Sequence, residues 1–339
     1  MSLMKPSLKK ISELTGYSVA TVSNTLSGNR KVSENAAEVI FNTARAIGYI
    51  TTSKIRRVKL VSLRLTGKIF DSTPFFTPLI DGVSAECAAY GYDLTYLPLD
   101  VDSPSFSEHL QKLRSDINSA IILIGSEMTG DEYHYFENFP IPIVTLDYWC
   151  PYFIFNGVEI NNYDAAYLAT NYLISKGHTR IGYLRGEFRI RAFHERGRGY
   201  RGCMFDHELF CPDSYTLTLG VTADRAYKDM LTHLGTERKM PSAFFADDDI
   251  IALGAVKALQ ERGYKVPEDI SIIGFDDIAF CSMSSPGLTS IHVPAYEMGS
   301  LAVRRLHEML ERSDSVITRT QVCVTVTERE SVRELSVLG

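Results

Sequence analysis

Acidic side chains gather at two places in the second half of the sequence. Asp247, Asp248 and Asp249 form an unbroken run, and Asp276 is followed by Asp277. Carboxylates in such numbers can hold Mg²⁺, cap the N-terminus of a helix, or accept hydrogen bonds from the hydroxyl groups of a ligand. Because no glycine-rich phosphate loop of the P-loop type accompanies them, a metal site is the minor interpretation. We expect one or two aspartates of the run to cap the helix that follows and one to face a ligand.

Nucleophilic and thiol chemistry is not indicated by the spacing of Ser, His, Asp or Cys. The six cysteines form no CxxC pair and have no histidine at zinc-ligand spacing: Cys87, Cys150, Cys203, Cys211, Cys281 and Cys323. We therefore expect no enzymatic activity, no metal and no cofactor, and we expect free thiols in a reducing cytoplasm.

The carboxylates follow segments that alternate between strand and helix periodicity. Strands are expected at 60–65, 92–97, 120–124, 143–146, 158–160, 181–184, 243–245 and 270–273, and helices at 78–91, 105–114, 163–176, 197–209 and 250–262. Because strands that alternate with helices form parallel sheets, and the pattern starts again after residue 160, the body is expected to be two doubly wound parallel-sheet α/β lobes. Ligands bind such sheets at the carboxyl ends of the strands, where Asp147, Asp248, Asp249 and Asp276 stand.

Two later segments are expected to connect the lobes. Residues 286–310 hold a connection and then a long helix, with Met298, Ala302 and Leu306 on one face. Residues 321–326 alternate like a late strand. The chain would then cross between the lobes more than once, which predicts a cleft that closes like a hinge.

The start of the chain has the pattern of short helices. Leu8, Ile11 and Leu14 recur at helical spacing, Gly16 can adopt the positive φ of a turn, and Ser18 is placed to cap a second helix. The second helix carries small or polar residues at its start and on its outer face: Val19, Ala20, Thr21, Ser23 and Asn24. Such side chains let a helix lie in the major groove of DNA, whereas an ordinary helical hairpin is the alternative.

Charge favours the DNA interpretation. Residues 1–59 carry ten Lys or Arg against three acidic residues, a charge of +7, whereas the whole chain carries −6. A basic head on an acidic body is expected where the head meets phosphate. The polar and basic residues 51–59 are expected to form a linker.

Composition is that of a soluble globular protein, with 45% hydrophobic and 22% charged residues among 339. The sequence does not start like a signal peptide, and no run of 18 apolar residues occurs. We expect a cytoplasmic protein without membrane contact.

Landmarks along nearly the whole sequence resemble those of the lactose and galactose repressor (LacI/GalR) family. They are Thr21-Val22-Ser23 after Gly16-Tyr17-Ser18, Gly48-Tyr49, Pro74-Phe75-Phe76, Gly177-His178-Thr179-Arg180-Ile181, 196–200, 246–249 with Ala252-Leu253-Gly254, 274–277, Pro286, Leu288-Thr289, Glu297-Met298-Gly299 and Arg329-Glu330-Ser331. Each landmark alone is weak, but together they occur in order and at appropriate spacing.

The resemblance implies a homodimeric, sequence-specific transcription regulator that acts as a repressor. Its head would read a palindromic DNA operator, and its body, similar to periplasmic sugar-binding proteins, would bind a small effector such as a sugar between the lobes. By position, Val19, Ala20 and Asn24 resemble the residues that read bases. Contacts to the DNA backbone are implied for Ser7, Ser18, Ser23 and Ser33. Thr21, which belongs to the Thr21-Val22-Ser23 landmark of the head, is a further DNA-binding candidate.

The resemblance also implies effector-binding residues. Arg196, Asp248 and Asp276 match polar ligand-binding positions, and Asp147 is a further candidate. Carboxylates and a guanidinium suit sugar hydroxyls, which both donate and accept. The family position that often stacks an aromatic ring on the ligand holds Val221, so Phe75, Phe76 and Trp149 are the candidate substitutes.

The linker departs from the family pattern. Thr51 replaces a proline, and no Ala-Arg-x-Leu occurs that would form a hinge helix and insert its leucine into the minor groove. Val58 falls near the inserting position, and Ile55 is the other apolar candidate. Basic residues of the linker can still bind phosphates: Lys54, Arg56, Arg57 and Lys59. Asp248 is a second departure, because many relatives have Asn there and an ionised Asp cannot donate.

These inferences predict a helix-turn-helix head at 1–50, a linker at 51–59 and a body at 60–339. Within the body, lobe 1 is expected at about 60–160 and 292–320, and lobe 2 at about 161–291 and 321–335. The alternative function is a sugar-processing enzyme or kinase on a two-lobed α/β scaffold, which would need a nucleotide or metal site.

Overall fold

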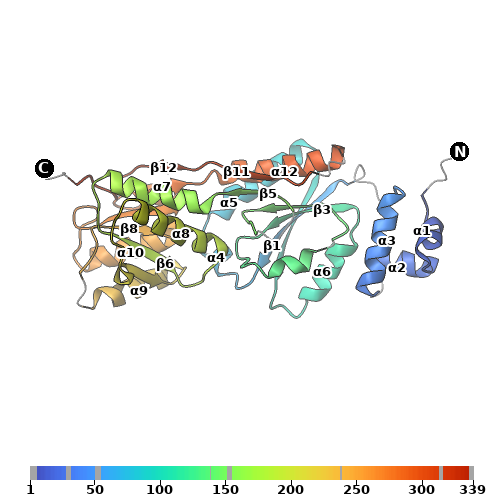
Figure 1. Cartoon of the computed structure of the whole chain (residues 1–339), viewed down its shortest axis with the longest axis horizontal. Helices are drawn as coiled ribbons and strands as arrows, with labels where there is room; N and C mark the ends of the chain where they lie inside the picture. Colours follow the sequence, from blue (N-terminus) through green and yellow to red (C-terminus); the bar gives the residue numbers. More distant parts are fainter. Residues whose placement is uncertain are drawn as a thin grey trace. The chain divides into compact units, whose positions relative to one another are not determined.

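The computed structural model describes residues 6–27, 32–49, 55–137, 139–150, 155–236, 239–312 and 316–335. The chain divides into two compact units (Figure 1). Unit 1 contains the residues up to 65, 82–158 and 299–319, and unit 2 contains 66–81, 159–298 and the residues from 320.

Three helices form the head: α1 (Leu8–Thr15), α2 (Val19–Ser27) and α3 (Glu34–Ala46). One small core joins them, and in the described part of the head it contains six buried apolar side chains: Ile11, Val22, Leu26, Ile40, Phe41 and Ala44. The helical spacing of the sequence predicts this helical head, and the prediction is confirmed.

The first sheet has the strand order β11-β5-β4-β3-β1-β2. Its strands are β1 (Arg57–Arg64), β2 (Asp93–Asp100), β3 (Ser119–Ile124), β4 (Ile143–Leu146), β5 (Asn156–Ile160) and β11 (Arg319–Val322). The pairs from β2 to β5 are parallel. Every residue of β3 and β4 is buried, as expected for parallel strands that are covered on both faces.

Helices cover both faces of the first sheet. They are α5 (Phe76–Ala89), α6 (Phe106–Ser115) and α12 (Ala295–Arg312), with a 3-10 turn η2 (Glu132–Phe136). In unit 1, α12 lies along α5, where Arg304 Nε donates to Glu86 Oε1 at 2.9 Å. Figure 1 shows α6 on the other side of the strands.

The second sheet has the order β12-β10-β9-β8-β6-β7. Its strands are β6 (Ile181–Gly186), β7 (Thr216–Leu219), β8 (Ala243–Ala246), β9 (Ser271–Asp276), β10 (Thr289–His292) and β12 (Thr325–Thr327). β12 pairs antiparallel with β10, and the other pairs are parallel. The remaining elements are α4 (Lys68–Ser72), α7 (Asn162–Ser175), α8 (Arg191–Asp206), η3 (Asp213–Tyr215), α9 (Ala223–Leu234), α10 (Asp249–Glu261) and α11 (Phe280–Met283).

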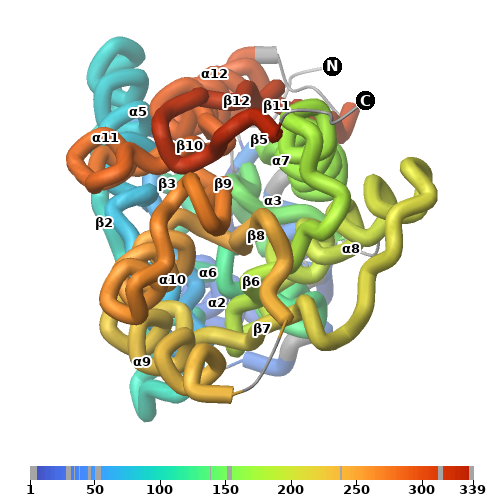
Figure 2. The backbone as a smooth tube through the Cα atoms, turned by 90° about the vertical axis from the view of Figure 1, so that its left-hand side faces the viewer, coloured from blue at the N-terminus to red at the C-terminus, as the bar shows by residue number. Residues whose placement is uncertain are grey.

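The helices of unit 2 pack in pairs, α7 with α8 and α9 with α10 (Figure 2). Gly199 lets the first pair approach closely, because a Cβ added there would lie 2.1 Å from the carbonyl oxygen of Tyr163. Side chains that cap the helix N-termini set where the helices begin. Asn161 accepts from the N–H of Asp164 at 3.2 Å to start α7, and Thr222 caps α9.

The predicted fold class, a helical head with two parallel-sheet α/β lobes, is confirmed. Several boundaries differ. β1 begins at Arg57 within the predicted linker, α8 begins six residues early, and the predicted connection after residue 286 contains the strand β10. The predicted late strand is two strands, β11 and β12, and β7 and α9 were not predicted. Residues 66–81 and 292–298 group with unit 2 rather than with the first lobe.

Candidate functional site

The turn between α1 and α2 is held by small side chains. Ser7 Oγ accepts from the N–H of Lys10 at 3.2 Å and so caps α1, which ends at Gly16 with φ of +76°. Ser18 Oγ accepts from the N–H of Thr21 at 3.1 Å at the start of α2. Because these oxygens act as acceptors in the caps, the hydroxyl protons of Ser7 and Ser18 can still point toward a phosphate.

The α2 helix turns its apolar side into the head core and its small residues outward. Val22 and Leu26 are buried, whereas Val19 is 45% exposed and Ala20 is exposed. The side chains of Thr21, Ser23 and Asn24 are partly exposed, and Ser33 is exposed before α3. The structure therefore places the predicted base-reading residues on one helix; their contact with DNA stays a prediction.

The linker candidates lie elsewhere than expected. Val58 is fully buried in β1 and Ile55 is 2% exposed, so neither side chain is presented to a minor groove, which corrects the idea that one of them inserts there. Arg57 Nη2 and Lys59 Nζ each lie 2.7 Å from a carboxylate oxygen of Asp116. These two basic side chains are ion-paired within unit 1.

The remaining linker candidates are Arg56, Thr51 and Lys54. Arg56 Nη1 donates to the carbonyl oxygen of Ile55 at 3.2 Å. Thr51 and Lys54 lie outside the described residues. Phosphate binding by Arg56 and Arg57 stays a prediction.

Two aspartates of the run at the end of β8 connect elements of unit 2. Asp247 Oδ2 accepts from the N–H of Gly186 at 2.8 Å and from Arg189 Nη1 at 2.5 Å, and Tyr183 donates to the same carboxylate. Asp249 accepts from Ser290 Oγ at 2.6 Å and from the N–H of Ile278 at 2.9 Å. These carboxylates are held by partners within the fold.

Asp248 caps α10, so one aspartate of the run has the capping role that the sequence predicts for one or two of them. Its Oδ1 accepts from the N–H of Ile251 at 2.7 Å, and the residue is 5% exposed. Burial raises the pKa of Asp248 to about 7, although the backbone hydrogen bond and the charge of Arg196 act in the opposite direction. Effector contact by Asp248 stays a prediction.

Arg196 is held rigidly at the ends of β8 and β9. Its Nε donates to Asn162 Oδ1 at 2.8 Å, and its Nη1 donates to the carbonyl oxygen of Asp247 at 2.5 Å. The guanidinium lies 3.5 Å from the ring centroid of Phe275. Its Nη2 lies 3.5 Å from Asp276 Oδ1, so the structure brings two predicted effector residues together.

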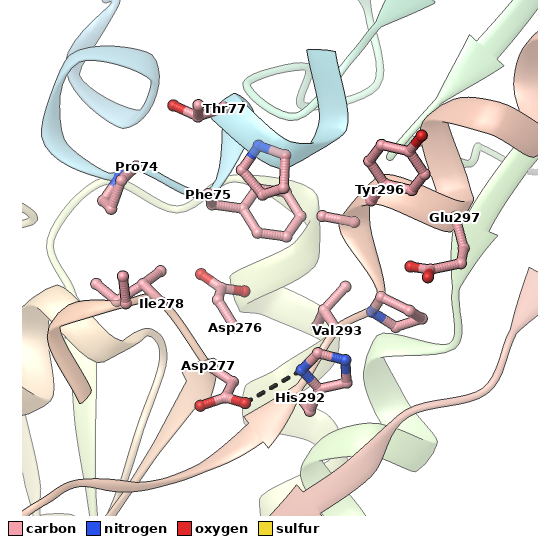
Figure 3. A pocket seen from close by; sticks show the side chains of 14 residues that line it. Pro74, Phe75, Thr77, Asp276, Asp277, Ile278, His292, Val293, Tyr296 and Glu297 are labelled. Carbon is pink, nitrogen blue, oxygen red and sulfur yellow. Dashed lines mark hydrogen bonds and ion pairs between the residues drawn. The ribbon is translucent and has the colours of Figure 1, made fainter. Parts of the chain in front are cut away.

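A cavity of about 370 Å³ opens beside Asp276 (Figure 3). All of its lining residues belong to unit 2: Pro74, Phe75, Thr77, Pro78, Asp276, Asp277, Ile278, Ala279, His292, Val293, Pro294, Ala295, Tyr296 and Glu297. Phe75 and Asp276 were predicted as effector-binding residues, and both line this cavity. A cavity with apolar walls and a few polar groups is the usual form of a small-molecule site.

One polar wall of the cavity is fixed by a network around Asp277. This carboxylate accepts from Arg329 Nη2 at 2.7 Å and from Thr327 Oγ1 at 2.9 Å, and it lies 3.1 Å from His292 Nδ1. Sequence reasoning did not assign His292, Tyr296 or Glu297 to a site. Their signal was weak, since only Glu297 belongs to one of the family landmarks.

The other predicted effector residues do not line the cavity. Phe76 is buried and packs on Phe70 with ring centroids 4.4 Å apart. Asp147 follows β4 in unit 1, with φ of +57°, and accepts from Ser126 Oγ at 2.5 Å. Trp149 carries the guanidinium of Arg319 over its ring at 4.3 Å, and Val221 is 1% exposed. Contact of Phe76, Asp147 and Trp149 with an effector stays a prediction.

The described residues contain neither a metal-binding cluster nor a membrane-spanning helix. No group of three or more His, Cys, Asp or Glu side chains there is arranged to hold a metal ion. No helix in the described ranges is both long enough and apolar enough to span a bilayer.

Known proteins resemble this chain over nearly its full length. Residues 170–332 match the periplasmic binding protein-like domain family. The ribose operon repressor of Escherichia coli K12 is 30% identical over 331 residues, which cover 96% of this chain and 99% of that protein. The HTH-type transcriptional repressor PurR of Haemophilus influenzae is 29% identical over 334 residues, covering 97% and 99%.

A solved structure supports the fold. The transcriptional regulator CelR in complex with cellobiose superposes with a TM-score of 0.72 at 22% identity, covering 96% of this chain and 100% of that one.

Proposed function

The chain belongs to the LacI/GalR family of transcription regulators, and we propose that it is a repressor whose affinity for operator DNA is controlled by a small effector, a sugar or sugar derivative. The observation that carries this proposal is the combination, in one chain, of an exposed, small-residue face on α2 and a ligand-sized cavity in unit 2.

DNA recognition is assigned to the head. With α2 in the major groove, Val19 and Ala20 would contact base edges and the thymine methyl group, and the amide of Asn24 can pair with adenine through two hydrogen bonds. Ser7, Ser18, Ser23 and Ser33 would donate to phosphates and fix the position of the helix along the duplex. Thr21 lies beside Ser18, with their hydroxyl oxygens 2.9 Å apart.

Effector recognition is assigned to the carboxyl ends of the strands in unit 2. Asp276 would accept hydrogen bonds from ligand hydroxyls while Arg196, behind the cavity wall, holds its carboxylate in place. Phe75 offers an apolar surface for a ring face. The ligand controls transcription through the difference between its affinities for the DNA-bound and DNA-free states.

A palindromic operator requires two heads related by a two-fold axis, so we propose that the chain acts as a homodimer. An effector that favours the DNA-free state is an inducer, and one that favours the DNA-bound state is a corepressor.

The test is the selection of bound sequences from random duplex DNA at a fixed salt concentration, with and without a panel of sugars. We expect a palindrome whose enrichment changes with at least one sugar. If a folded protein enriches no palindrome, the repressor proposal is wrong.

The effector assignment is tested by Asp276→Ala. We expect the response of operator binding to the sugar to be lost while operator affinity without sugar stays within about twofold, because all described residues of the head core belong to unit 1. Full effector affinity in this variant would refute the assignment of Asp276. Glu268→Ala, an exposed acidic residue of unit 2 outside the cavity, is the matched control.

A further inference from the structure

The charges around the cavity of unit 2 are unbalanced. Three carboxylates line it, on Asp276, Asp277 and Glu297, and none of the described residues that line it is Lys or Arg. The first two carboxylates have cationic neighbours behind the cavity wall: Arg196 Nη2 lies 3.5 Å from Asp276, and Arg329 Nη2 lies 2.7 Å from Asp277. Both of these charges are therefore largely compensated within the protein.

Glu297 is different. It lies in the first turn of α12, its side chain is exposed, and no described residue forms an ion pair or hydrogen bond with it. The wall of the cavity thus carries one carboxylate whose charge no side chain of the described chain compensates. An anionic ligand would be repelled there, whereas a cationic group would gain a partner.

Two aromatic side chains line the same cavity. Phe75 and Tyr296 both line it, and Figure 3 shows Tyr296 next to Glu297 at the start of α12 with Phe75 across from them. Ring faces attract cations as well as apolar ring faces of ligands, so aromatic and acidic groups favour the same class of ligand.

We propose that the effector carries a protonated amine, as an amino sugar does, and that Glu297 selects for this positive charge. The proposal rests on the proposed function and narrows its effector class: phosphorylated and carboxylated sugars are excluded, and neutral sugars bind more weakly than their amines.

A purely structural role for Glu297 is the competing explanation. A carboxylate in the first turn of a helix stabilises the helix through the N-terminal dipole, whatever lies in the cavity. Ligand-binding measurements distinguish the two roles. If Glu297 only stabilises the helix, the protein has no preference for a positively charged ligand over its neutral analogue.

The experiment is calorimetric titration of the full chain with matched hexoses, hexosamines and hexose 6-phosphates of gluco, galacto and manno configuration. We expect one hexosamine to bind about five- to tenfold more tightly than the matched hexose, as for a single partly exposed ion pair. The matched hexose 6-phosphate should bind more weakly than the hexose. The preference should shrink as salt is added.

Variants assign the preference to its residue. Glu297→Gln should bring the ratio of hexosamine to hexose affinity to about one, while Glu297→Asp keeps the charge and most of the preference. Glu268→Gln, an exposed carboxylate of unit 2 outside the cavity, should leave the ratio unchanged. Affinity for the neutral hexose, measured in each variant, reports any general damage to the cavity.

Three results would overturn the proposal: tightest binding by a hexose or a phosphate, no binding by any member of the panel, or a preference that survives in Glu297→Gln. Operator selection with the same preparation separates this failure from that of the proposed function. If a palindrome is enriched but the protein does not prefer the amine, only the inference about Glu297 is wrong. If the protein prefers the amine but enriches no palindrome, only the repressor assignment is wrong.

Discussion

At the N-terminus of α10, Asp248 is a buried carboxyl group that accepts a hydrogen bond from the N–H of Ile251. Burial raises its pKa to about 7, and burial raises the pKa of neighbouring Asp249 to about 6. At and below neutral pH, a protonated Asp248 can both cap the helix and donate a hydrogen bond, as an asparagine amide does. Protonated Asp248 can therefore make the same kinds of hydrogen bond as the Asn that many relatives have at this position.

Changing Asp248 to Asn should make stability less dependent on pH. The folded state has the higher pKa, so it binds more protons than the unfolded chain between about pH 4 and pH 7, and the contribution of Asp248 to stability falls as pH rises through that range. We expect the free energy of unfolding of the parent to fall by on the order of 4 kcal/mol relative to Asp248→Asn across this window, because each unit of pKa shift is worth about 1.4 kcal/mol. Asn does not titrate and is also a good cap. Chemical denaturation at several pH values measures it; a difference that is independent of pH contradicts it.

At the scale of elements, α2 combines a buried apolar side with an exposed polar side on nine residues. Val22 and Leu26 anchor it in the head core, so substitutions on the outer face should change DNA recognition without changing the fold. The helix is thus the element on which sequence readout can be tested residue by residue.

Asn24→Ala should relax the base preference at one position of each operator half-site, at a cost of about 1–3 kcal/mol in discrimination. Its effect on the salt dependence of binding should be small, because no phosphate contact is removed. Competition binding with operators substituted at each position measures both quantities. Asn35→Ala, an exposed Asn on α3, is the matched control, and an unaltered preference in Asn24→Ala would mean that another residue reads the base.

Local periodicity was enough to predict the helices of the head and strands such as β3 and β4, because each has a clear apolar pattern of its own. It was not enough for β10, whose four residues are a strand because they pair with β9 and β12. In β1, basic residues alternate with buried Val58 and Leu60, and this alternation was a strand signal that the charge concealed.

The candidate site was predictable only in part, for a related reason. Phe75 and Asp276 stand in recognisable family motifs, but the cavity joins residues 74–78 to 276–279 and 292–297. Packing between segments about 200 positions apart leaves no local pattern in a single sequence. His292, Tyr296 and Glu297 were accordingly missed.

At the scale of the whole molecule, the head has a core of its own. Among the described residues of the head, six buried side chains join its three helices, which is little for a folding unit of its size. The body instead rests on two six-stranded sheets. The parts that bind DNA and effector should therefore respond separately to heat and to ligand.

Calorimetry should show a small transition for the head, with an enthalpy of about 30 kcal/mol, below a larger transition for the body. Operator DNA should raise the temperature of the small transition and the effector that of the large one, because each ligand stabilises the part that binds it. A single transition that both ligands shift would contradict independent folding of the head.

The close approach of α7 and α8 at Gly199 has a consequence for genetics. Any side chain there meets the carbonyl oxygen of Tyr163, so an alanine must push the helices apart and weaken the body while leaving the residues of the head unchanged. Gly199→Ala should therefore be a heat-sensitive allele: a reporter gene under the operator would stay silent in cool cultures and switch on in warm ones, and return to the cool condition would restore silence as new protein folds.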